Sequence, residues 1–168
     1  MKINVCVADE SHAVYAQQIC DLVYVSAQER GTGIAKRTPE YIAQKMKVGK
    51  AVIALTEEGE LAGFAYVETW SHTLFVANSG LIVAHKFRKT GLAKRIKQEV
   101  FNLSRRKYPD AKIFSITTGA AVMKINSDMG FRPVPFSELT DDAEFWAGCK
   151  GCKNFDILER NNYKMCLC

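Results

Sequence analysis

The segment Ile82-Val83-Ala84-His85-Lys86-Phe87-Arg88-Lys89-Thr90-Gly91-Leu92-Ala93 decides the fold, because it joins a predicted strand to a predicted helix. Its spacing is Arg88-x-x-Gly91-x-Ala93. Gly91 permits a tight turn and a close approach of the backbone to a ligand. The N–H groups that open the following helix then face outward and can bind an anion. The segment is therefore predicted to bind phosphate groups, with Arg88, Lys89 and Thr90 adding side-chain donors.

Basic residues are frequent within this segment and in the helix that follows it. Between residues 86 and 107 there are nine Lys or Arg residues and one Glu, an excess of eight positive charges. Such an excess attracts a polyphosphate, although Arg105, Arg106 and Lys107 are expected only to solvate a helix. The Lys-Ser ending of a P-loop and the three-glycine dinucleotide pattern are both absent from the sequence, which argues against an ATPase and a Rossmann dinucleotide site.

The elements on both sides of the segment indicate the fold class. Strands are predicted over residues 3–7, 51–55, 61–69, 74–83 and 112–118. Helices are predicted over 11–28, with Ser11 as cap, and over 38–49, with Thr38 as cap, as well as over 92–107 and 120–128. Residues 163–168 could form a final strand. This order indicates a mixed α/β domain, an α+β mixed sheet with a central strand-helix-strand crossover. Open α/β sheets bind ligands where such a crossover turns from strand into helix.

Composition limits the class of protein. The chain has 168 residues, of which 48% are hydrophobic and 24% charged, and its net charge is +5. These values fit one globular domain and exclude a disordered or collagen-like chain. No apolar run is long enough to cross a membrane, and the start of the chain does not resemble a signal peptide. A cytoplasmic location is therefore expected.

Six cysteines must then be explained in a reducing compartment. Cys6 and Cys20 lie in apolar patterns and are expected to be buried thiols. The other four form a C-x2-C…C-x-C pattern made of Cys149, Cys152, Cys166 and Cys168. Two alternatives stand for these four: a structural zinc site, or thiols that bind no metal or contact another subunit. No metal ligand is predicted for the catalytic, cofactor-binding and substrate-binding residues themselves.

Several motifs resemble one enzyme superfamily. Val83 followed by Arg88-x-x-Gly91-x-Ala93 is similar to the coenzyme A loop of the GCN5-related N-acetyltransferase (GNAT) superfamily, and Met129-Gly130-Phe131 is similar to the end of its second cofactor motif. Shorter matches resemble the transferase domain of bacterial N-acetylglutamate synthases: Lys36-Arg37-Thr38-x-Glu40, Thr117-Thr118, and Gly130-Phe131-Arg132-Pro133 followed by Leu139. The resemblance implies a GNAT-like acyltransferase domain over residues 1–140, completed by a Cys-rich segment over 141–168.

The resemblance also implies a co-substrate, acetyl-CoA or another acyl-CoA. Its pyrophosphate would bind the amides of residues 89–93, and its pantetheine arm would pair with residues 81–83 as an added strand does. The implied cofactor-binding residues are Leu81, Ile82, Val83, Arg88, Lys89, Thr90, Gly91, Leu92, Ala93 and Asn126.

The catalytic residues depart from the family's pattern. Many members carry a Glu base on the long strand, where this chain has Ala77, and a Tyr acid four residues before the motif's glycine, where this chain has Asn126. Glu68 on the preceding strand is the best remaining carboxylate, and Asn78 and Ser79 could hold a water. The candidate catalytic residues are thus Glu68, Asn78, Ser79 and Asn126.

Arg30, Lys36 and Arg37 precede the second helix, a region that lines the acceptor pocket in these folds. Because guanidinium groups bind carboxylates, the predicted acceptor is a small amino acid, glutamate in arginine biosynthesis, or else the acyl group is dicarboxylic, such as succinyl. A solvated basic loop is the plain alternative. Other readings of the chain are a protein N-acetyltransferase, and a catalytically silent module that binds acyl-CoA or nucleic acid. Neither nucleic acid nor membrane is the expected partner, and a homodimer is allowed.

Overall fold

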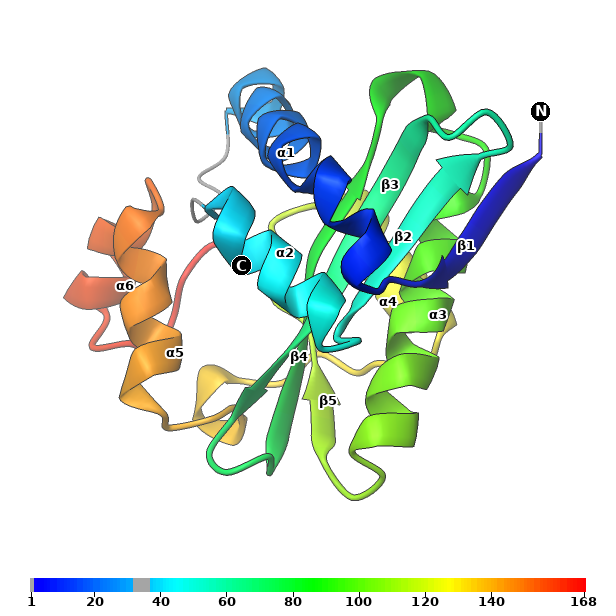
Figure 1. Cartoon of the computed structure of the whole chain (residues 1–168). Helices are drawn as coiled ribbons and strands as arrows, with labels where there is room; N and C mark the ends of the chain where they lie inside the picture. The colour runs from blue at the N-terminus through cyan, green and yellow to red at the C-terminus, as the bar shows by residue number, and fades with distance from the viewer. Residues whose placement is uncertain (1, 32–36) are drawn as a thin grey trace.

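The computed structural model describes residues 2–31 and 37–168. Five strands form one sheet in the order β1-β2-β3-β4-β5 (Figure 1). The strands are β1 (Ile3–Val7), β2 (Ala51–Thr56), β3 (Leu61–Trp70), β4 (Phe75–Val83) and β5 (Lys112–Phe114). Neighbours from β1 to β4 are antiparallel, whereas β5 runs parallel to β4. This mixed sheet confirms the predicted α/β class.

Helices cover both faces of the sheet. On one face lie α1 (Ala16–Arg30) and α2 (Pro39–Lys47), and on the other lies α3 (Leu92–Lys107), which connects β4 to β5 (Figure 1). The remaining helices are α4 (Ala120–Asp128), α5 (Ala143–Ala147) and α6 (Phe155–Arg160). Short 3-10 turns are η1 (Glu10–Tyr15), η2 (His85–Phe87), η3 (Phe136–Glu138) and η4 (Gly148–Gly151).

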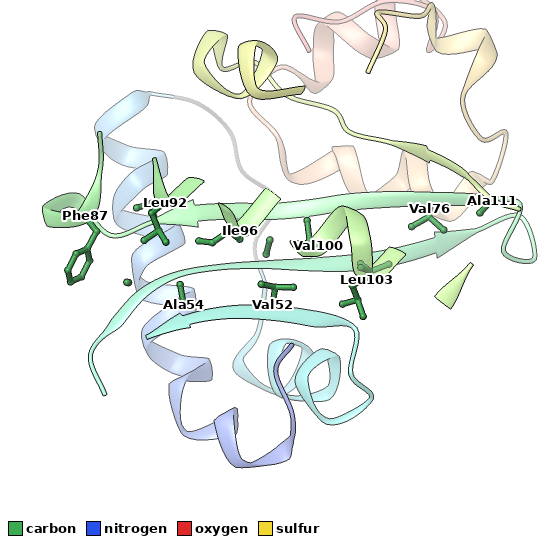
Figure 2. Close-up of a cluster of buried hydrophobic side chains, with 13 residues drawn as sticks. Val52, Ala54, Val76, Phe87, Leu92, Ile96, Val100, Leu103 and Ala111 are labelled. Atoms are coloured by element: carbon green, nitrogen blue, oxygen red, sulfur yellow. The ribbon is translucent and has the colours of Figure 1, made fainter. Parts of the chain in front are cut away.

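The core consists of two apolar layers, one on each face of the sheet. In the layer under α3, apolar residues recur at helical spacing and pack on the strands (Figure 2). The helix supplies Leu92, Ile96, Val100 and Leu103, and the strands supply Val52, Ala54 and Val76. The layer under α1 and α2 contains Ile19, Ile42, Met46 and Phe64. Burial of both layers holds β4 and α3 in a fixed relation, which positions the loop between them.

The start of the first helix differs from the prediction. Asp9, not Ser11, is the cap: its carboxylate accepts a hydrogen bond from the Ser11 N–H at 2.9 Å, and the Asp9 N–H donates to His12 Nδ1 at 3.2 Å. This reciprocal pair opens the 3-10 turn η1, so that α1 begins only at Ala16. The Thr38 cap is confirmed, because Thr38 Oγ1 accepts from the Tyr41 N–H at 3.2 Å.

Two predicted strands also differ. The strand expected over 112–118 ends at Phe114, because β5 pairs with β4 over three residues only. Residues 163–168, which could have formed a final strand, form no strand in the described chain. Asn162 and Tyr163 have φ angles of 51° and 60°, and this left-handed backbone is incompatible with an extended strand.

The segment after residue 139 packs against the turn between β3 and β4. The Ser71 N–H donates to Asp142 Oδ2 at 3.1 Å, and the hydroxyls of Ser71 and Thr140 lie 2.7 Å apart. The rings of Trp70 and Phe145 meet edge to face, with centroids 5.4 Å apart. None of the helices in the described ranges is both long and apolar enough to cross a membrane.

Candidate active site

The strand β4 separates from β5 halfway along its length. Only Phe75, Val76 and Ala77 pair with β5, so within the described chain residues 78–83 have no partner on that side. The backbone of this stretch can therefore accept an added strand. The predicted pantetheine-binding residues Leu81, Ile82 and Val83 all lie there.

A bulge interrupts β4 beside this edge. Ser79 pairs with Tyr66 and Ile82 with Phe64, so that two residues of β4 face one residue of β3. Gly80 lies in the bulge with a φ of 66°, a left-handed conformation that favours glycine. Bulges change the direction of backbone groups. Here the redirected groups lie next to the unpaired edge.

The loop that follows β4 is held by its own side chains. Arg88 donates from Nε to the Val83 carbonyl at 3.2 Å, from Nη1 to Glu29 at 3.1 Å and from Nη2 to Ser26 at 3.0 Å. Thr90 Oγ1 donates to the Phe87 carbonyl at 2.7 Å. Arg88 and Thr90 thus donate hydrogen bonds within the protein and shape the loop. The sequence had instead predicted that their side chains donate to a bound anion.

The loop leads into the N-terminus of α3. Gly91 is the N-cap with a φ of 82°, and its carbonyl accepts from the N–H groups of Lys94 and Arg95. The amides of Leu92 and Ala93, in the first turn, have no carbonyl to bond within the helix. The Leu92 side chain is buried in the core and anchors this end. The geometry agrees with an anion site made of backbone amides.

A carboxylate lies on the α2 face of the sheet. Tyr41 Oη donates to Glu68 Oε2, and Lys45 Nζ lies 2.6 Å from Glu68 Oε1. Burial, together with the nearby Tyr66 and Glu68, raises the pKa of Tyr41, so its hydroxyl stays protonated and donates. Glu68 is the direct cross-strand neighbour of Ala77. The chain thus supplies, from β3, a carboxylate next to the β4 position where the GNAT pattern expects one.

Arg37 lies beside this carboxylate cluster. Its Nε donates to Tyr66 Oη at 2.5 Å, and its guanidinium carbon is 5.7 Å and 6.0 Å from the ring centroids of Tyr66 and Tyr41. Burial raises the pKa of Tyr66, and Arg37 partly offsets this effect. Of the other two predicted acceptor residues, Arg30 ends α1 and Lys36 lies outside the described residues.

The structure does not bring Asn78 and Ser79 together. They are consecutive strand residues and point to opposite faces. Asn78 faces α3, where its Nδ2 donates to Ser104 Oγ at 2.7 Å. Ser79 shares the face of Tyr66 and Glu68. A single water held by both side chains, as predicted, is therefore incompatible with the fold.

Asn126 lies on α4, at the edge of a cavity of about 570 Å³ between β5, α3 and α4. Its Oδ1 is buried and has no hydrogen-bond partner among the described residues. Buried acceptors are rarely left unpaired in a native structure. An external N–H donor would satisfy this oxygen, and the assignment of Asn126 to the cofactor-binding set stays a prediction.

Sequence reasoning missed three members of the site: Tyr41, Lys45 and Tyr66. The first two are four residues apart on α2 and therefore share one helix face. Tyr66 and Glu68 are two residues apart on β3 and therefore share one sheet face. These spacings were visible in the sequence, but they become informative only once Glu68 is known to face α2.

No family model matches the sequence, and no curated protein matches it. Among solved structures, the chain is similar to N-acetylglutamate synthase from Neisseria gonorrhoeae complexed with coenzyme A and N-acetyl-glutamate, with 18% identity and a TM-score of 0.67. That match covers 84% of this chain but only 31% of the synthase. A GNAT-family acetyltransferase from Staphylococcus aureus gives 14% identity and a TM-score of 0.66, over 84% of this chain and 92% of that one.

A third similar structure is diaminobutyrate acetyltransferase from Paenibacillus lautus, in complex with its substrate and coenzyme A. It gives 14% identity and a TM-score of 0.58, over 77% of this chain and 74% of that one. The chain therefore has the fold of the GNAT acetyltransferases.

Proposed function

We propose that this protein is an N-acyltransferase, which moves an acetyl group, or another acyl group such as succinyl, from acyl-CoA to the amine of a small amino acid. The observation that carries the proposal is the unpaired edge of β4, which the loop containing η2 connects to the free amides at the start of α3. The unpaired edge of β4 can bind a pantetheine arm, and the amides at the start of α3 can bind a pyrophosphate. Neighbours with this fold were crystallised with coenzyme A.

In this reaction the amine nitrogen attacks the thioester carbonyl, and the thiolate of CoA leaves. The protein must hold the two reactants together and stabilise the oxyanion that forms. The backbone at the Gly80 bulge supplies redirected groups beside the reacting carbonyl. Because a CoA thiolate is a good leaving group, it can leave without a strong acid at the position of Asn126.

Glu68 takes the proton that the amine loses. It is the carboxylate on the α2 face beside the bulge, and Tyr41 and Lys45 fix both of its oxygens. Fixing a base in one orientation keeps it within reach of the amine. Ser79, on the same face, can hold a water that relays the proton.

The proposed acceptor is an acidic amino acid, glutamate in arginine biosynthesis. Of the described residues around Tyr41 and Tyr66, Arg37 and Lys45 each carry a positive charge and Glu68 carries a negative one, so these three side chains sum to one positive charge. A positive cluster favours a carboxylate-rich acceptor over a diamino acid. The synthase of similar fold was crystallised with N-acetyl-glutamate, which supports the same choice.

We also propose that residues 1–140 form the acyltransferase domain and that the Cys-rich segment 141–168 completes it. The contacts of Ser71 with Thr140 and Asp142 support this boundary, because they join the segment to the β3–β4 turn.

The function is tested by mass spectrometry of products formed from acetyl-CoA or succinyl-CoA with a panel of free amino acids. Thiol dyes would react with the six cysteines, so products must be detected directly. Acylated glutamate would establish both donor and acceptor. Tight CoA binding without any acylated amino acid would contradict the proposal and favour a protein acceptor or a silent binding module.

A further inference from the structure

The four cysteines of the C-terminal segment converge on one place. Cys149 and Cys152 come from η4 and its end, and Cys166 and Cys168 come from the irregular chain after α6. All four line a single small cavity of about 30 Å³. The remaining lining residues are Ile116, Phe136, Trp146, Asn154, Phe155 and Leu158. Two thiol pairs that are 14 positions apart in the sequence thus meet in a mainly apolar environment.

Asn154 connects the two pairs. Its N–H donates to Cys152 Sγ at 3.5 Å, and its carbonyl accepts from Cys166 Sγ at 3.7 Å. The Cys152 N–H donates to the Cys149 carbonyl at 2.9 Å, which closes the turn between the first two thiols. Backbone N–H groups that donate to sulfur commonly support thiolate ligands. The backbone is thus already arranged around Cys152 as around a ligand.

The four thiols lie near one another. Cys149 is within electrostatic range of Cys152 and Cys166, and Cys168 is within range of all three. This proximity agrees with their place around one cavity.

We propose that Cys149, Cys152, Cys166 and Cys168 bind one zinc ion as a closed structural site. Four thiolates are a preferred ligand set of structural zinc, and soft sulfur ligands favour it over magnesium or calcium. On binding, each thiol that forms a Zn–S bond releases its proton to the solvent, so no oxidant or reductant is required. The lining of the small cavity includes neither Glu68 nor any residue of the α3 loop, although Cys168 also lines the larger cavity beside Asn126. The role of the site is to hold the C-terminal segment in place.

The ligand set closes when the ion binds. As the described residues stand, no three His, Cys, Asp or Glu side chains are grouped closely enough to hold a metal ion. No helix or strand follows Arg160 in the described chain, so Cys166 and Cys168 can approach the first pair without the loss of a secondary-structure element. Coupling of metal binding to local ordering is common in small thiolate sites.

The test measures metal content of the whole protein, purified with zinc present and under reducing conditions. The expected result is about one zinc per chain. Cys149→Ser and Cys166→Ser should lower this content at least about tenfold. Cys20→Ser, which removes a thiol from α1 instead, should leave it unchanged and serves as the matched control.

A second measurement guards against variants that fail to fold. In the unaltered protein, removal of zinc with a chelator should lower Tm and make four more thiols reactive, and added zinc should reverse both changes. Zinc content near zero with no uptake on addition would overturn the proposal. So would iron in place of zinc, or a disulfide between Cys149 and Cys152 in the reduced preparation. Because these readouts need no acyltransferase activity, they are independent of the proposed function.

Discussion

The α-carbon of Gly80 faces the ring of Tyr66 so closely that a β-carbon there would lie 2.5 Å from Tyr66 Cε1. The φ of Gly80, 66°, adds a second reason for glycine. The bulge of β4 and the ring of Tyr66, which Arg37 contacts, are therefore packed so closely that only glycine fits between them. Any side chain at position 80 must displace the ring or straighten the bulge.

Gly80→Ala should therefore lower both stability and activity. We expect a loss of about 1–3 kcal/mol in the free energy of unfolding, from overpacking and left-handed strain, and a fall in kcat. Urea denaturation and product formation measure the two effects. Gly59→Ala is the matched control: its φ is 81°, but a β-carbon would meet only Tyr15 Oη at 3.5 Å. Equal losses of activity in both variants would contradict a special role for the bulge.

Gly91→Asp should weaken CoA binding at least about tenfold, because the added carboxylate would repel a phosphate at the start of α3. The protein itself leaves room, since nothing lies within 4 Å of a β-carbon at this position. Gly91→Ala has the same backbone strain at a φ of 82° and no charge. Calorimetric titration with CoA compares the two. If alanine weakens binding as much as aspartate, strain rather than charge is the cause.

Glu68→Gln should lower kcat by about 10²–10⁴-fold, the usual contribution of a general base. Glutamine keeps the size of the side chain, its one amide oxygen can still accept from Lys45, and its NH2 group can donate to Tyr41 Oη, so the fold should survive. Circular dichroism checks the fold, and steady-state kinetics measure kcat. Glu57→Gln removes an exposed carboxylate of the β2–β3 turn and should change nothing. An unchanged kcat in Glu68→Gln would remove Glu68 as the base.

Arg37→Ala should raise the KM for the acceptor amino acid more than the KM for acyl-CoA, because the guanidinium lies on the α2 face and not at the α3 loop. Loss of a charged hydrogen bond to a carboxylate costs about 1.5–3 kcal/mol, or roughly 10–100-fold in KM. Arg106→Ala, on the far end of α3, is the control. Equal changes in both KM values would place Arg37 outside the acceptor site.

The sequence was sufficient for the elements that depend on local pattern. The helices predicted over 92–107 and 120–128 have these bounds in the structure. The apolar spacing of α3 and the glycine before it are local signals, and local signals need no knowledge of the rest of the chain. The loop between β4 and α3 was predicted for the same reason.

The sequence was insufficient where distant residues meet. The pairing of Glu68 with Ala77 depends on the register of β3 and β4, and the bulge at Gly80 shifts that register. The contact between Arg37 and Tyr66 joins positions 29 apart and was missed. Asn78 was assigned to the reacting side because strand alternation was not applied to it. These errors share one cause: which helix the side chains on each face of a strand contact is decided only when the strand packs against the rest of the chain.

Lys97 should make the protein more stable as the pH rises. Its side chain is 1% exposed, and Nζ lies 4.9 Å from the Phe131 ring centroid. Burial lowers its pKa from 10.5 to about 8. The native state therefore loses this proton before the unfolded state does, and the stability cost of the buried charge, fully present below about pH 8, disappears as the pH approaches 10.5.

Lys97→Met should remove that cost. At pH 7 the variant should be more stable by about 1–3 kcal/mol, and the advantage should vanish at high pH, where native Lys97 is neutral. Urea denaturation of both proteins at neutral and at high pH isolates the effect, because all other titrating groups are shared. Lys94→Met, exposed one turn earlier on α3, should differ from the unaltered protein by less than about 0.5 kcal/mol. If Lys97→Met is more stable by the same amount at both pH values, the difference in the free energy of unfolding comes from packing and not from the buried charge.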